Sequence, residues 1–192
     1  MKYDKFIDVE GSFASQLSFL SEAVSDDEAR FFMKYIHIEP SDKGDELLGV
    51  ATDGRHLHLI DPLKKDTAEY FGITQGYWQL LRKYKRQDRV WIARLDDSVT
   101  NGWSFPNWHK IVPTGEAVYK TTFKGFSFDE RLNHNGLSRL LHEFPEETGI
   151  NLVYLQSLGT FCEWNVEWFG QNKAIRFIDG DRMALIMPIQ MD

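Results

Sequence analysis

The side chains best suited to bind a ligand form a basic cluster between residues 82 and 89. A helix over residues 76–87 would bury an apolar stripe consisting of Tyr77, Leu80, Leu81 and Tyr84. The bases would then lie on the opposite face and its flanks: Arg82, Arg86 and Arg89, with Lys83 and Lys85 beside them. Such a ridge is either a solvated face or a phosphate-binding surface, and phosphate contacts would ignore base sequence and weaken with salt.

Other residue patterns offer little catalytic or metal chemistry. His56 and His58 would share one strand face, a spacing that can ligate a metal if Asp53 and Asp61 approach, although surface or interface histidines are the favoured interpretation. The single cysteine, Cys162, lies in a strand-like stretch and is interpreted as a small buried hydrophobe. The chain has no G-x-x-x-x-G-K-[ST], G-x-G-x-x-G, H-E-x-x-H or G-x-S-x-G motif. We therefore expect no catalytic residues, no metal and no cofactor.

Composition favours a globular protein with an uneven charge. The 192 residues are 42% apolar and 14% aromatic, which can fill a core. The net charge of −7 comes from residues 1–63, which carry 13 acids and 6 bases, whereas residues 64–192 carry 16 of each. This acidity argues against indiscriminate nucleic-acid binding but permits a local basic face. Because no apolar run is long enough for a membrane span or signal peptide, we expect a cytoplasmic protein with no membrane partner.

Three units, each a helix with several strands, would position the basic cluster. The first helix would follow Gly11 and bury a stripe of Phe13, Leu17, Leu20 and Val24. Its outer face bears serines and acids. The second is the basic helix over residues 76–87. The third would bury Leu137, Leu140, Leu141 and Phe144 and carry Arg139 on its outer face. Strands are predicted over residues 31–40, 90–95, 118–128, 150–158, 161–170 and 173–178, so the pattern indicates an α+β fold with sheets in one layer and helices in another.

Two hairpins repeat one sequence frame. Residues 51–62, ATDGRHLHLIDP, and residues 177–188, FIDGDRMALIMP, share D-G-x-x-x-x-L-I-x-P. Asp-Gly favours a tight turn between strands because glycine tolerates a positive φ angle. The repetition indicates duplicated architecture.

The order of these motifs resembles the bacterial DNA polymerase III β sliding clamp. The carrying stretches are D-D-E-A-R-F-F after a helix, A-T-D-G-R-H-L, F-P-N-W-H-K-I-V-P and the final D-G-D-R-M-A-L-I-M-P-I. The family has similar stretches, approximately D-x-x-R-x-x-L, A-T-D-G-H-R-L, F-P-D-Y-x-x-V-I-P and V-L-M-P-M. The similarity spans most of the chain and is loosest over residues 114–170.

The resemblance implies a DNA-clamp-like fold that acts without catalysis. In the family, domains of two helix-plus-strand halves close into a ring whose helices surround duplex DNA. Residues 1–113 would form one complete domain, similar to the middle one, and residues 114–192 a reduced last domain, with no counterpart of the first. Arg82, Lys83, Lys85, Arg86, Arg89 and Arg139 would then contact duplex DNA without sequence specificity. A homo-oligomeric ring would need four copies if helices are counted, or three if domains are counted.

The resemblance also implies a pocket for the clamp-binding peptides of replication proteins. It would consist of Thr52, Gly54, Arg55, His56 and Leu57 of the first hairpin, with Val112, Pro113, Met187, Pro188 and Ile189. Met and branched side chains suit apolar peptide anchors, although residues such as Leu57 and Ile189 could equally belong to the core. Where the family has Gly-His-Arg-Leu, this chain has Gly-Arg-His-Leu, so Arg55 and His56 exchange sheet faces.

The main alternative keeps the clamp fold and drops the DNA. In that interpretation the chain is a protein-interaction module that binds clamp-binding peptides or a clamp without encircling anything. The serine-rich, acidic outer face of the first helix favours it, because a helix that lines a DNA channel should face phosphates. An enzyme with a new kind of site is the least favoured interpretation.

Overall fold

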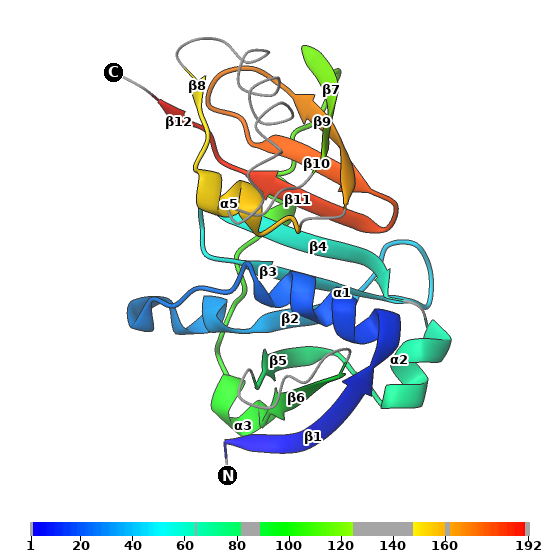
Figure 1. Ribbon diagram of the computed structural model, residues 1–192. Coiled ribbons are helices and arrows are strands. Elements are labelled where there is room, and N and C mark those ends of the chain that lie inside the picture. Colours follow the sequence, from blue (N-terminus) through cyan, green and yellow to red (C-terminus); the bar gives the residue numbers. More distant parts are fainter. Residues whose placement is uncertain (1, 64, 82–88, 125–147, 160–161, 191–192) are drawn as a thin grey trace. The chain divides into compact units, whose positions relative to one another are not determined.

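The chain folds into two compact units, residues Met1–Pro106 and Asn107–Asp192. The computed structural model describes every residue except 1, 64, 82–88, 125–147, 160–161 and 191–192 (Figure 1). The predicted division after residue 113 falls inside the second unit, and the assignment of clamp-like domains to 1–113 and 114–192 stays a prediction. Among the described residues, no helix is both long and apolar enough to cross a membrane.

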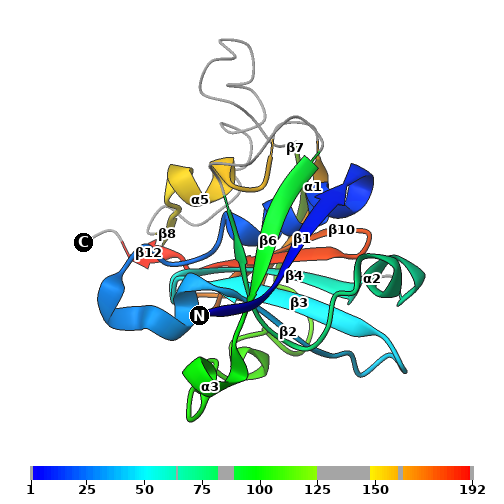
Figure 2. The same ribbon diagram turned by 90° about the horizontal axis from the view of Figure 1, so that it is seen from below.

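The first unit is an antiparallel sheet with helix α1 on one face. Its described strands are ordered β1-β6-β5-β2-β3-β4, and α1 packs across β1, β3, β4, β5 and β6 (Figures 1 and 2). The elements are β1 (Tyr3–Glu10), α1 (Gly11–Ser21), η1 (Glu28–Lys34), β2 (Ile36–Pro40), β3 (Leu47–Thr52), β4 (His56–Leu63), α2 (Lys65–Phe71), β5 (Gly76–Leu80), β6 (Arg89–Leu95) and α3 (Asp97–Thr100).

The first predicted helix is confirmed, and its stripe forms the centre of this unit. Phe13, Leu17 and Leu20 are at most 2% exposed, whereas Val24 lies beyond the helix end at Ser21. The stripe packs closely on β3, because a Cβ at Gly49 would lie 2.6 Å from Leu20 Cδ1 and the leucine side chain would have to shift. Burying each such leucine contributes about 1.5–3 kcal/mol.

The predicted helix over residues 76–87 is wrong where the structure describes it. Residues Gly76–Leu80 form β5, which pairs with β2 on one side and β6 on the other. Tyr77 and Trp78 are both buried although adjacent strand residues point to opposite faces. Burial on both faces of a central strand produced the dense apolar spacing that resembled a helical stripe.

Two other predictions for local structure also needed correction, and two elements were missed. The predicted strand over residues 31–40 holds only for β2, since residues Glu28–Lys34 form the 3₁₀ segment η1. Residues 150–158 contain a short helix instead of a strand, and its start is capped by Asn151, whose Oδ1 accepts a bond of 3.0 Å from the Val153 N–H. Strand β1 and helix α2 were not predicted at all.

Four strands of the second unit pair antiparallel in the order β7-β9-β10-β11. A separate two-residue pairing joins β8 and β12. The described elements are η3 (Trp108–Lys110), β7 (Tyr119–Lys124), β8 (Thr148–Gly149), α5 (Leu152–Gln156), β9 (Glu163–Trp168), β10 (Ile175–Asp179), β11 (Arg182–Ile186) and β12 (Ile189–Gln190). Phe123, Trp164 and Phe177 are buried in its core. The predicted third helix, which carries Arg139, lies outside the described residues.

Candidate partner-binding site

Both predicted Asp-Gly hairpins are confirmed, and the first is tightly closed. Its turn joins β3 to β4, and Gly54 has a φ of 89°, a conformation that favours glycine. The Thr52 hydroxyl donates to the His56 carbonyl at 2.6 Å and accepts from the Gly54 N–H at 3.0 Å. The Asp53 carboxylate accepts from the N–H groups of Arg55 and His56 at 2.7 and 2.8 Å. The turn is therefore fixed by its own side chains.

The predicted pocket residues of this hairpin divide into buried and exposed sets. Thr52, His56 and Leu57 are buried, and Leu57 belongs to the core of the first unit. Gly54 and Arg55 are exposed at the tip. The exchange of arginine and histidine relative to the clamp pattern thus leaves an arginine at the surface and a histidine inside.

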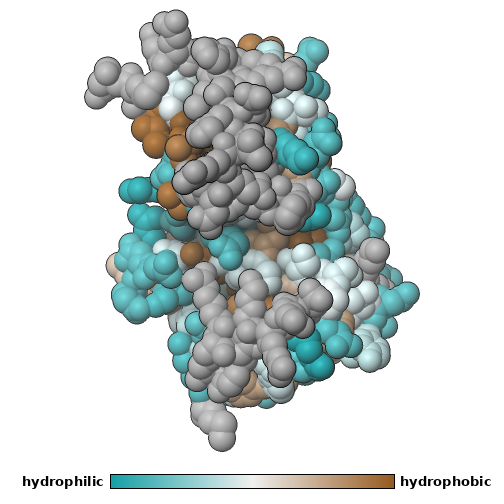
Figure 3. All heavy atoms as spheres, viewed as in Figure 1, coloured by the Kyte–Doolittle hydropathy of each residue, from teal (hydrophilic) through white to brown (hydrophobic). Residues whose placement is uncertain are grey.

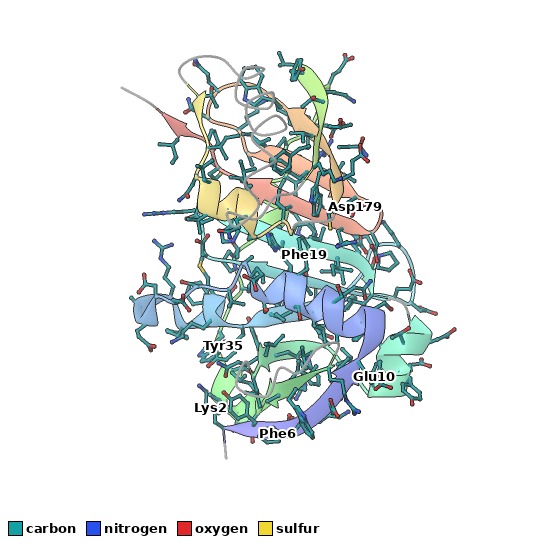
Figure 4. The ribbon with its side chains drawn as sticks, viewed as in Figure 1. Lys2, Phe6, Glu10, Phe19, Tyr35 and Asp179 are labelled. Atoms are coloured by element: carbon teal, nitrogen blue, oxygen red, sulfur yellow. The ribbon has the colours of Figure 1, made fainter. Side chains whose placement is uncertain are left out.

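The two histidines of β4 bind the end of α1. His56 Nε2 lies 3.3 Å from the Glu22 carbonyl, and its Nδ1 lies 2.9 Å from Asp53 Oδ1. His58 is fully buried, donates from Nδ1 to the Phe19 carbonyl at 2.6 Å and stacks on the Phe19 ring at 4.1 Å. Phe19 is labelled on α1 in Figure 4.

These contacts give the histidine pair a structural role. Burial lowers the pKa of His58 to about 3, despite the bond to Phe19, so its ring is neutral. Burial alone would raise the pKa of Asp53, but hydrogen bonds from His56 and the turn N–H groups hold it below its ordinary value. Within the described part of the chain, no three His, Cys, Asp or Glu side chains gather as a metal site would require.

The second unit contains a pocket that brings together three of the predicted peptide-binding residues. Val112, Pro113 and Met187 line a hollow of about 300 Å³. The remaining lining residues are Lys110, Ile111, Thr114, Asn172, Lys173 and Ala174. Ile111 and Met187 are 45% and 37% exposed, so the hollow presents apolar surface to solvent. Apolar side chains also gather on the face that carries α5 and β12 (Figure 3).

Pro188 and Ile189 continue from Met187 into β12. They are not among the residues that line the pocket. Ile189 pairs with Gly149 of β8 and is 50% exposed. The structure thus brings together the end of the F-P segment and Met187 of the final motif, but not the last two predicted residues.

An ion-pair network that sequence reasoning missed holds one wall of this pocket. Arg176 on β10 donates to the Pro113 carbonyl at 3.3 Å and to Glu167 of β9 at 2.7 Å. Its guanidinium lies 4.8 Å from the centre of the Phe169 ring, and Glu167 also pairs with Lys120 at 3.0 Å. Burial would raise the pKa of Glu167, but Arg176 and Lys120 hold it below its ordinary value. Pairing the two predicted strands in register would have placed Glu167 opposite Arg176.

The predicted DNA-binding residues are mostly outside the described part of the chain. Arg82, Lys83, Lys85, Arg86 and Arg139 lie there. Arg89 begins β6 and is engaged by acids of β1, with a bond to Asp8 and an ion pair of 3.8 Å to Glu10. Helix α1 carries no base along its length.

A second hollow lies in the first unit and was not predicted. It measures about 390 Å³ and lies between the end of α1 and β5. Its lining residues are Ser21, Val24, Ser25, Asp26, Lys34, Trp78, Gln79, Leu80 and Leu81.

Comparison with known proteins identifies the fold. No protein-family model and no curated protein sequence matches the chain. Solved structures of sliding clamps do. The DNA polymerase III β subunit of Borrelia burgdorferi aligns at a TM-score of 0.59 and 12% identity, over 99% of this chain and 65% of its own. The β clamp of Caulobacter crescentus aligns at 0.60 and 13%, over 99% and 66%. The clamp of Bartonella birtlesii, solved bound to griselimycin, aligns at 0.60 and 14%, over 100% and 68%.

At these identities the comparison establishes the fold. The chain spans about two thirds of the length of the clamps that it matches. The predicted α+β, clamp-like fold class is confirmed. This chain therefore has the fold of bacterial DNA polymerase III β sliding clamps over about two thirds of their length.

Proposed function

We propose that this chain is a non-catalytic, clamp-like protein that binds short apolar segments of replication proteins in the pocket of its second unit. The observation that carries the proposal is the grouping of Val112, Pro113 and Met187 around one hollow. These residues come from segments more than 70 positions apart, and the clamp resemblance had assigned all three to a peptide pocket.

The lining chemistry suits an apolar anchor. Ile111 and Met187 are partly exposed, and covering the exposed part contributes a fraction of the about 1.5–3 kcal/mol that full burial of such a side chain gives. The unbranched thioether of Met187 adapts to differently shaped partners. Arg176 fixes the Pro113 carbonyl, so the wall is held before a peptide arrives and less ordering is required on binding.

Two residues of the first hairpin remain candidate peptide contacts. Gly54 and Arg55 are exposed and can be reached by a ligand. Thr52, His56 and Leu57 would act indirectly, by fixing the turn that presents Arg55.

The test is to fill the pocket and measure peptide binding. A fluorescein-labelled peptide Gln-Asn-Leu-Leu-Phe supplies an apolar anchor without charged side chains. Thr114→Trp places an indole at the pocket, and Thr122→Trp, on the exposed face of β7, is the matched control. We expect a loss of at least about tenfold in affinity for Thr114→Trp alone. Equal binding by wild type and Thr114→Trp would refute the assignment.

Duplex DNA is a second candidate ligand. It is favoured by the basic residues that lie between β5 and β6 in the sequence. Arg82, Lys83, Lys85 and Arg86 place four cations within five residues of a chain that is acidic overall. The test measures binding of a duplex at increasing salt. Arg82→Glu/Arg86→Glu should weaken it, and Lys43→Glu/Lys124→Glu, with the same change in net charge, should not. Arg89→Glu is measured separately because it also breaks the pair with Asp8.

Absence of any salt-dependent DNA binding would leave the interaction-module function. That outcome agrees with the lack of lysine and arginine on α1, the helix that would have to face the DNA phosphates.

Self-association is a further part of the proposal. Phe6 of β1, labelled in Figure 4, and Trp91 of β6 are 53% and 38% exposed on neighbouring strands, and they form apolar surface that a second copy could cover. Light scattering over a wide concentration range tests this. Three or four copies would agree with a closed ring, whereas the monomer mass throughout would exclude both ring counts and leave the interaction module.

A further inference from the structure

The pocket of the second unit combines an apolar lining with positively charged side chains. Of its nine lining residues, two are lysines, Lys110 and Lys173, and none is acidic. The apolar part consists of Ile111, Val112, Pro113, Ala174 and Met187. Lys110 lies at the end of η3 and Lys173 in the turn before β10, so the two cations come from separate segments.

Both lysines are exposed, and their ammonium groups are available to a ligand. Within the described residues, no ion pair or side-chain hydrogen bond involves either ammonium group. The contrast is Lys120 in the same unit, which pairs with Glu167 at 3.0 Å. Because none of the described residues that line the pocket is acidic, the two cations give this lining a charge opposite to the net charge of −7 of the whole chain.

We propose that the pocket selects peptides in which acidic residues lie next to an apolar anchor. This inference rests on the proposed peptide-binding function and specifies the partner class. The apolar side chain covers Ile111 and Met187, and the acidic side chains pair with Lys110 and Lys173. A volume of about 300 Å³ is at the lower limit for small-molecule sites and suits one or two side chains better than a cofactor. Exposed lysines are suited to selecting and steering a partner, and contribute less to raw affinity.

The test compares two labelled peptides that differ only in charge, Glu-Asp-Leu-Leu-Phe and Gln-Asn-Leu-Leu-Phe. At low salt the acidic peptide should bind about three- to tenfold more tightly, and the difference should shrink as salt screens the exposed pairs. Lys110→Glu/Lys173→Glu should reverse the preference and favour Lys-Lys-Leu-Leu-Phe. The matched control, Lys43→Glu/Lys124→Glu, makes the same change in net charge outside the pocket and should keep the preference for acid.

The outcomes separate this inference from the function on which it rests. Equal binding of the acidic and neutral peptides would overturn the charge selection and leave the apolar pocket function standing. Binding of neither peptide would overturn both. An equal loss of preference in the pocket variant and its control would assign the effect to overall charge and also overturn the inference. All four lysines are exposed, so we expect both double variants to fold. Circular dichroism checks this.

Discussion

The two Asp-Gly hairpins share one sequence frame but serve different purposes. In the first unit the strand after the turn, β4, is buried along residues 56–60. In the second unit the strand after the turn, β11, begins half-buried, and its burial ends at Ile186. The next residue, Met187, lines the pocket, whereas the matching residue of the first hairpin, Asp61, bonds to Ser41 at 2.5 Å.

Two further matched positions contribute to the difference. His56 and His58 of the first hairpin correspond to Arg182 and Ala184 of the second. The histidines bind the end of α1, whereas Arg182 pairs with Asp179 at the turn itself, 3.3 Å away. Asp179 is labelled at the tip of that hairpin in Figure 4. The frame thus specifies a hairpin. The residues at its variable positions determine whether the strand after the turn supports a helix or leads to a binding surface.

The largest expected effect tests the shared, buried part of the frame. Ile60 and Ile186 occupy the same frame position and are both fully buried. Ile60→Ala and Ile186→Ala should each destabilise their own unit by about 2–5 kcal/mol, because each leaves a cavity. Hydrogen exchange in peptides from β3–β4 and from β10–β11 reports which unit is affected. A loss below about 1 kcal/mol at either site would show that the two hairpins are not equally buried.

A second prediction uses the histidine that only the first hairpin has. The folded pKa of His58 is about 3, below an unfolded value of about 6.5, so the unfolded state binds its proton first as pH falls. The stability of the first unit should therefore fall by about 1.4 kcal/mol per pH unit between about 6.5 and 3. His56 and Asp53 face this ring, and Asp53, whose pKa is also lowered, adds a further loss below about 4.

The matched variant for this slope is His58→Leu. It loses the bond to the Phe19 carbonyl and should be less stable at neutral pH, but the slope between pH 6.5 and 4 should flatten. Urea unfolding at several pH values measures it. An unchanged slope would assign the acid sensitivity to other groups. The hairpin of the second unit, with Ala184 at this position, lacks the contribution.

The hairpins were predictable because their signals are local. Asp-Gly between two apolar stretches fixes the turn whatever surrounds it. Strand β5 was not, because its apolar spacing also fits a helix, and only its pairing with β2 and β6 makes it a central strand with buried residues on both faces. Arg176 was missed for the same reason: its role depends on the pairing with Glu167, and nothing in its own segment indicates it. Spacing thus predicted local elements, and it failed where a neighbouring strand determined the structure.

The smallest expected effect on stability lies just beyond the second hairpin. Met187 is 37% exposed, so Met187→Ala should change the free energy of unfolding by no more than about 0.5 kcal/mol. The same change removes the flexible side chain from the pocket and should weaken binding of the Gln-Asn-Leu-Leu-Phe peptide by about tenfold. Fluorescence polarisation and urea unfolding measure the two quantities on one sample. A stability loss as large as that of Ile186→Ala would make Met187 a core residue. If Met187→Ala instead weakens peptide binding with little loss of stability, Ile186 is the last residue of the core and Met187 is the first residue of the binding surface.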